Sequence, residues 1–212
     1  HMNYDSSKTE VPQTFSSSLW SSALKCDLND SGETLLFSDD FSWTININSQ
    51  YPYTDWLNTY CTVDKSIRFD YMISEGTVDM NGWGYPSSTK KSIYVRPGYI
   101  QMNSSSALGA AVTPAFSMLE APTDVKISFD ACGFYQYFSG VMDTSRIINV
   151  EIVGSGTFAD GSNVLSITLE RSDAWQDCTA TILSASSDTY LVIGTGAASK
   201  NRVFFDNFRL AK

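Results

Sequence analysis

Apolar and polar residues alternate over short segments in the second half of the chain. The apolar positions of the three clearest segments are Val125, Ile127, Phe129 and Ala131; Ile148, Val150 and Ile152; and Leu165, Ile167 and Leu169. A period of two places alternate side chains on opposite faces of a β-strand. The pattern therefore predicts strands with one face in a core, and Ala180 and Ile182 indicate a further strand of the same kind.

Other apolar runs are continuous or less regular. Residues 190–193 (Tyr-Leu-Val-Ile) and 203–205 (Val-Phe-Phe) are expected to form strands buried on both faces. In the first half, strands are expected at residues 35–41, 66–71, 92–95 and 98–102, separated by Gly, Asn, Asp, Ser and Pro. No amphipathic helix of about 12 residues is evident. The sequence therefore predicts an all-β fold of two antiparallel sheets packed as a sandwich, with almost no helix after residue 40.

The N-terminal segment has a different composition. It is rich in serine, with Ser16, Ser17 and Ser18 followed by Ser21 and Ser22. We expect residues 1–33 to be an extension or linker and residues 34–212 to form the β-sandwich domain.

The charge of the chain limits its partners. Charged residues make up only 17% of the sequence, and the formal net charge is -9 with a pI near 4.4. Phosphate backbones bind clustered Lys and Arg, so nucleic acid is not expected as a partner. No apolar run approaches the roughly 18 residues that cross a bilayer, so no direct membrane insertion of the domain is expected. The abundance of Ser, Thr, Asn, Gly and Tyr is typical of secreted β-proteins and favours an extracytoplasmic setting.

Four cysteines, Cys26, Cys61, Cys132 and Cys178, are spread along the chain. No C-x-x-C pair occurs among them, which is against a zinc ribbon or a thioredoxin-like site. Two interpretations remain open: disulfide bonds in one of several pairings, or small buried apolar side chains.

The chain offers few groups for catalysis. Its single histidine is His1, which we expect to be, with Met2, a remnant of cloning, so no native imidazole is expected for a Ser-His pair or a zinc site. A glycoside hydrolase would need two carboxyl groups, and Glu151 and Glu170 lie on expected solvent faces without forming a recognisable pair. We therefore do not expect an enzyme.

Acidic residues lie between aromatic residues in two segments, 36–41 (Leu-Phe-Ser-Asp-Asp-Phe) and 203–210 (Val-Phe-Phe-Asp-Asn-Phe-Arg-Leu). A carboxylate in so apolar a strand is costly to bury unless it is paired, hydrogen-bonded or bound to a cation. Oxygen ligands without nearby His or Cys suit calcium. The alternative is that Asp39, Asp40 and Asp206 mark strand ends and cap turns.

These two segments, together with residues 113–116 (Thr-Pro-Ala-Phe) and 124–130 (Asp-Val-Lys-Ile-Ser-Phe-Asp), carry a resemblance over roughly residues 35–212. The chain resembles jelly-roll, galactose-binding-like domains of Bacteroidetes surface proteins, among them cleaved-adhesin domains and carbohydrate-binding modules. The resemblance implies a jelly-roll sandwich with adjacent first and last strands and a structural calcium near Asp39, Asp40 and Asp206. Ser42 and Asn207 depart from the acidic residues of many relatives.

Aromatic residues gather in the first half of the chain. Flat rings stack on the C–H faces of sugars, while amide, carboxylate and guanidinium groups reach the hydroxyls. Trp83, in the segment Gly82-Trp83-Gly84, is expected to be exposed, because its glycine neighbours offer little cover. Trp43 and Trp175, next to strands, are expected in the core. The predicted ligand-binding residues are Trp83, Tyr85, Tyr94, Trp56, Asn81 and Arg96.

The leading functional interpretation is a non-catalytic carbohydrate-binding module of a secreted or cell-surface bacterial protein, with a glycan as its partner. The first alternative is an adhesin or assembly domain that binds a protein through the same aromatic loops. The second is a fragment of a glycoside hydrolase. A glycan site would combine one or two exposed aromatic rings with converging polar groups, whereas a protein interface would present a broad apolar patch.

Overall fold

The computed structural model describes residues 32–46, 67–68, 80–96, 98–136, 139–170, 174–197 and 200–212. Residues 1–31 lie outside this part, so the serine-rich extension over 1–33 stays a prediction. Residues Leu36–Lys212 form one compact unit. Nearly all of its regular structure is β-strand, which confirms the all-β prediction.

The described residues contain thirteen strands and two short helical segments, joined by turns and loops. The strands are β1 (Leu35–Asp39), β2 (Ile67–Arg68), β3 (Ile93–Arg96), β4 (Tyr99–Met102), β5 (Ala110–Val112), β6 (Thr123–Gly133), β7 (Tyr135–Gln136), β8 (Val141–Met142), β9 (Ile147–Val153), β10 (Val164–Thr168), β11 (Gln176–Ala185), β12 (Tyr190–Gly194) and β13 (Val203–Ala211). The helical segments are α2 (Trp43–Asn46) and the 3-10 turn η3 (Ser88–Lys90).

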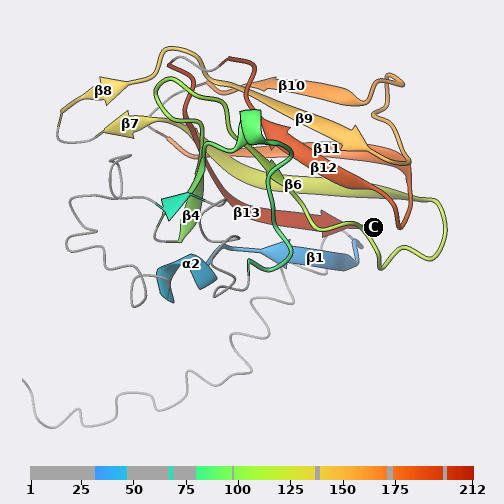
Figure 1. Ribbon diagram of the computed structural model, residues 1–212. Helices are drawn as coiled ribbons and strands as arrows, with labels where there is room; N and C mark the ends of the chain where they lie inside the picture. The colour runs from blue at the N-terminus through green and yellow to red at the C-terminus, as the bar shows by residue number, and fades with distance from the viewer. Residues whose placement is uncertain are drawn as a thin grey trace, which may run out of the picture. The chain divides into compact units, whose positions relative to one another are not determined.

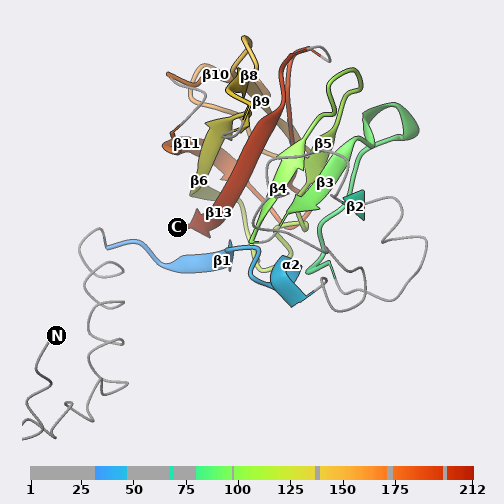
Figure 2. The same cartoon turned by 90° about the vertical axis from the view of Figure 1, so that its left-hand side faces the viewer.

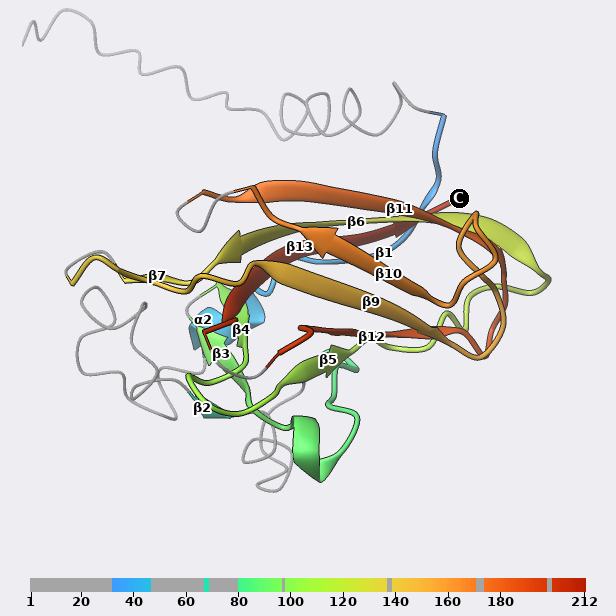
Figure 3. The same ribbon diagram turned by 90° about the horizontal axis from the view of Figure 1, so that it is seen from above.

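The strands form two main sheets that lie in layers (Figures 1 and 3). The larger sheet has seven strands in the order β11-β6-β13-β4-β3-β2, with β1 paired to β13 off this path. The smaller has four strands in the order β10-β9-β12-β5, and β7 and β8 form a separate pair. The registered pairs are antiparallel. The predicted antiparallel two-sheet sandwich of jelly-roll type is confirmed.

The core lies between the inner faces of the two sheets. In β6, Val125, Ile127, Phe129 and Ala131 are buried, as their alternation predicted. The smaller sheet contributes buried residues of β9 and β12 to the same cluster, namely Ile148, Val150, Ile152, Leu191 and Ile193. Each fully buried aliphatic or aromatic side chain contributes roughly 1.5–3 kcal/mol to folding. The shared cluster is therefore what holds the two layers together.

The first and last strands, β1 and β13, are neighbours, as predicted. Figure 2 shows β13 in the larger sheet beside β6 and β4. A register shift between Asp206 and Arg209 forms a bulge in β13, and Asn207 within it has a φ of 50°. Asn tolerates this left-handed conformation better than most residues. Because the bulge adds one residue, Phe205 and Phe208 both face the core although they are three positions apart.

Cys132 and Cys178 are both buried. Burial, followed by the negative charges of Asp177 and Asp130, raises the pKa of Cys178 to about 11. For these two residues the interpretation as small buried side chains is confirmed, while Cys26 and Cys61 lie outside the described residues. No helix within the described residues is long and apolar enough to cross a membrane.

Candidate functional site

Trp83 is only 4% exposed, so the prediction that it forms an exposed platform is wrong. Its ring packs against Phe41 at a centroid distance of 5.1 Å and against Phe208 at 5.5 Å. The neighbouring glycine permits close packing: a Cβ on Gly82 would lie 2.9 Å from Pro114 Cγ. Gly82 therefore brings the loop down onto the domain and turns the indole inward.

The carboxylate of Asp39 organises the residues around Trp83. It is nearly buried and lies at the end of β1. Its Oδ2 accepts hydrogen bonds of 2.8 Å from both Trp83 Nε1 and Asn81 Nδ2. Its Oδ1 accepts a bond of 2.7 Å from the Phe41 backbone N–H, and Trp43 Nε1 donates to both oxygens at 3.2 Å. Trp43 is partly buried against the core. These hydrogen bonds join the end of β1 to the loop that carries Asn81 and Trp83.

Those of the other predicted ligand-binding residues that the structure describes do not gather into a surface site. Tyr94 is 9% exposed and Arg96 is fully buried, with its guanidinium donating to Gln101 Oε1. Both were predicted to face a ligand, but they lie on a covered part of the larger sheet. Tyr85 is partly buried and packs against the core. Trp56 lies outside the described residues.

The predicted calcium ligands lie near one another but serve different roles. N–H donors occupy both oxygens of Asp39. Asp40 is exposed and accepts a bond of 3.0 Å from the Ser42 backbone N–H, which lowers its pKa. Asp206 is half-buried; desolvation, together with the charges of Asp130, Asp40 and Asp39, raises its pKa to about 6. Within the described ranges, no group of three or more such side chains is arranged to hold a metal ion. The calcium site stays a prediction.

Three aspartates form a row across the outer face of the larger sheet. Asp130 of β6 is opposite Asp177 of β11 on one side and Asp206 of β13 on the other. Like charges directly opposite one another destabilise a sheet. Asn207 Nδ2 donates to Asp130 at 2.8 Å, which offsets part of this cost. The row leaves carboxylate oxygens on an open sheet face.

Trp175 is 47% exposed, so the prediction that it lies in the core is wrong. It immediately precedes β11 on the side of the strand that carries Asp177 and Thr179, opposite to the buried Cys178 and Ile182. The alternation of polar and apolar residues after Trp175 was the signal that could have identified it as outward-facing.

An aromatic cluster holds Trp175 in place. Its ring meets Tyr99 nearly perpendicularly, at 5.7 Å and 82°, and lies 6.5 Å from the ring of Phe204. Tyr99 also packs on Phe204 at 5.2 Å, and Phe204 packs on Phe134 at 5.6 Å. Because Phe204 and Phe134 are buried, the exposed indole rests on a fixed base.

Arg202 packs on Phe134, one of the two buried rings beneath Trp175. Its guanidinium carbon lies 3.4 Å from the centroid of the Phe134 ring. The same guanidinium forms a two-pronged ion pair with Asp143, at 2.9 Å from Nε to Oδ2 and 2.8 Å from NH2 to Oδ1. Such pairs fix geometry as well as charge. We call the exposed indole of Trp175 with Tyr99, Asp177 and Asp130 the Trp175 surface.

The fold and this surface define an antiparallel β-sandwich domain with a rigid, exposed aromatic ring on one sheet. No family model and no curated protein matches the chain. Among solved structures, the K1 cleaved adhesin domain of Lys-gingipain from Porphyromonas gingivalis W83 is 16% identical, with a TM-score of 0.40, covering 63% of this chain and 87% of that domain.

Two carbohydrate-binding modules are similar to the same extent. The CBM22-1–GH10 modules of a Clostridium thermocellum xylanase, complexed with xylohexaose, are 14% identical, with a TM-score of 0.43, covering 64% of this chain and 27% of that one. The CBM22-1 xylan-binding domain from Paenibacillus barcinonensis is 11% identical, with a TM-score of 0.37, covering 62% and 85%. The kinds of neighbour agree with the resemblance noted in the sequence. At these identities and TM-scores the likeness carries no argument about function, which has to come from the chain's own residues.

Proposed function

We propose that this protein is a non-catalytic carbohydrate-binding module that acts outside the cytoplasm, on a bacterial cell surface or in a secreted protein. The observation that carries the proposal is the exposed indole of Trp175, held by Tyr99 and Phe204. A ring whose orientation is fixed before binding loses little entropy when a sugar stacks on it.

Polar groups for the sugar hydroxyls lie beside this ring. Asp177 is two residues after Trp175 on the same face of its strand, which corresponds to about 7 Å along a β-strand. Asp130 lies opposite Asp177 on the next strand. Carboxylates accept hydrogen bonds from hydroxyl groups. A ring and two carboxylates on one face can therefore fix both the stacking and the orientation of a sugar unit.

The test is binding to a glycan array by the wild type and by Trp175→Ala. We expect the variant to bind the preferred glycan at least about tenfold more weakly, and Trp175→Phe to retain part of the affinity. Met118→Ala removes another exposed large apolar side chain and serves as a matched control. Equal binding by wild type and Trp175→Ala would overturn the proposed site, and no binding to any glycan would overturn the function.

The second candidate function, a protein-binding adhesin domain, is favoured by one specific observation. Val141 and Met142 of β8 are 44% and 53% exposed. Exposed apolar side chains that form a contiguous patch mark protein interfaces. If adhesion to a protein surface is impaired by Val141→Ser with Met142→Ser and not by Trp175→Ala, the adhesin function is supported instead.

A further inference from the structure

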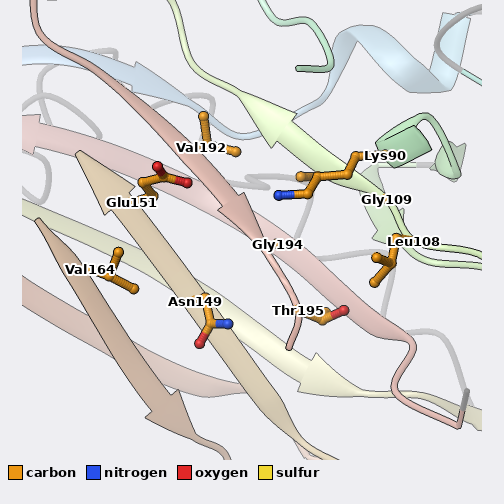
Figure 4. Close-up of a pocket in the computed structure, with 10 residues that line it drawn as sticks. Lys90, Leu108, Gly109, Asn149, Glu151, Val164, Val192, Gly194 and Thr195 are labelled. Atoms are coloured by element: carbon orange, nitrogen blue, oxygen red, sulfur yellow. The ribbon is translucent and has the colours of Figure 1, made fainter. Parts of the chain in front are cut away.

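A pocket of about 120 Å³ lies on the outer face of the smaller sheet, on the other layer of the sandwich from the Trp175 surface. Residues of β9, β10 and β12 form one side, and η3 with the residues before β5 forms the other (Figure 4). Six of its lining residues are Lys90, Gly109, Asn149, Glu151, Val192 and Gly194.

The pocket exists because two small residues, Gly194 of β12 and Ala110 of β5, are paired at its floor. Gly194 of β12 is opposite Ala110 of β5 and Asn149 of β9. A Cβ on Gly194 would lie 2.9 Å from the Cβ of Ala110, so the strands pack too closely there for a larger residue. The floor of the pocket is therefore backbone and a methyl group, with longer side chains around it.

Polar side chains reach this floor from two directions. In β9, Ile148, Val150 and Ile152 face the core, so Asn149 and Glu151 face outward. Figure 4 shows Glu151 and Lys90 on opposite sides of β12. Neither side chain makes a hydrogen bond or an ion pair with another described residue. Asn149 Oδ1 accepts a bond of 2.7 Å from Ser166 Oγ, which leaves its Nδ2 to donate.

The chemistry of this lining suits a polyhydroxylated ring. The Lys90 ammonium and the Asn149 amide can donate to sugar oxygens, and the Glu151 carboxylate can accept from hydroxyls. Val192 and Leu108 offer apolar contact to the C–H groups. One cation and one anion leave the pocket without net formal charge, which favours a neutral ligand. Cavities for drug-sized ligands exceed roughly 300 Å³, so this smaller one suits a single ring.

We propose that this pocket binds one neutral monosaccharide unit, as a second site separate from the Trp175 surface. Glu151 is the only acidic residue among the described lining residues. Glycoside hydrolysis uses a pair of carboxyl groups, so the pocket binds its sugar without cleaving it. The two sites lie on different sheets and act independently, so the pocket does not depend on the proposed function of the Trp175 surface.

The test is a titration of the ¹⁵N-labelled full chain with glucose, galactose, mannose and xylose, followed by NMR. We expect at least one sugar to shift the backbone amides of Gly109, Val192 and Gly194. Glu151→Gln and Lys90→Met should each weaken that binding by about tenfold or more, because each removes a charged hydrogen-bonding group. Glu120→Gln, which removes an exposed carboxylate elsewhere, should leave binding unchanged.

The outcomes separate the two sites. Pocket shifts that persist in Trp175→Ala support the second site, even if glycan-array binding proves absent. The proposal is overturned if none of the four sugars shifts these amides, or if Glu151→Gln and Lys90→Met bind as well as the wild type. Stronger binding of glucuronic acid or glucosamine than of the neutral sugars would overturn the choice of a neutral ligand.

Discussion

The indole N–H of Trp83 donates a hydrogen bond of 2.8 Å to Asp39 Oδ2, joining two residues that are 44 positions apart. One end of this bond lies on the first strand of the sandwich and the other in a glycine-flanked loop. The bond is buried, so removing the Asp39 carboxylate would leave the indole N–H without its acceptor.

Replacing Trp83 should damage the fold rather than a binding site. We expect Trp83→Ala to lower the free energy of unfolding by about 3–5 kcal/mol, the cost of a deleted core aromatic residue. Trp83→Phe keeps most of the packing and should lose less, about 1–3 kcal/mol, through the missing donor. Urea denaturation measures both values, and Trp175→Ala is the control. A Trp83→Ala protein as stable as the control would contradict the buried position.

Asp39 tests the same cluster from its other end. In Asp39→Asn an amide N–H₂ group replaces one carboxylate oxygen. This group cannot accept a hydrogen bond, so the N–H groups that face it lose their acceptor. We expect a loss of about 1–3 kcal/mol or more in the free energy of unfolding. Asp40→Asn, one residue further and exposed, should change stability by no more than about 0.5 kcal/mol. Equal effects of the two substitutions would show that the Asp39 cluster contributes little.

Asp206 predicts an unusual dependence of stability on pH. Its pKa in the folded protein, about 6, lies above the ordinary value of 3.8. Between these two values the folded protein holds a proton that the unfolded chain releases, so the contribution of Asp206 to stability falls as pH rises from about 4 to about 6. Asp206→Asn should remove that dependence and raise the denaturation midpoint near neutral pH. As a control, Glu120→Gln should keep the wild-type dependence of stability on pH. If Asp206→Asn also keeps it, Asp206 is not the group responsible.

The calcium ion predicted from the sequence offers a second test of the repulsion between these carboxylates. If the ion predicted from the sequence binds beside Asp206, it takes the place of the proton there. We expect calcium to raise the denaturation midpoint near pH 7, and to raise it much less near pH 4.5, where Asp206 is protonated. The shift should be absent in Asp206→Asn. A shift that magnesium reproduces at equal ionic strength, or one that persists in the variant, would argue against this site.

Alternation along the strands predicted most of the fold. The inward set Val125, Ile127 and Phe129 is buried as expected. The continuous run 203–205 is also buried throughout, because Phe204 faces outward under Tyr99 and Trp175. The spacing of apolar residues along a strand reflects which of its faces are buried. The strands and the sandwich could therefore be predicted from the sequence.

The site was not predictable in the same way. Glycines around Trp83 suggested exposure, but the partner that buries its N–H, Asp39, is far away in the sequence. Trp175 was assigned to the core because it adjoins a strand. However, it is separated from the polar residues Asp177 and Thr179 by even numbers of positions, and this spacing places it on their outer face of the strand. Local pattern describes a strand's two faces, whereas loop burial depends on contacts between distant segments.

The Asp39 cluster also bears on how the domain would respond to mechanical tension. A short edge strand normally peels away one hydrogen bond at a time when its end is pulled. Here the last residue of β1 is fastened by N–H groups of Phe41, Trp43, Asn81 and Trp83 to one carboxylate. Two of these donors, Asn81 and Trp83, lie 42 and 44 positions further along the chain. A force applied at Leu35 would therefore pass at Asp39 from the ladder of β1 to two side-chain bonds with a distant loop.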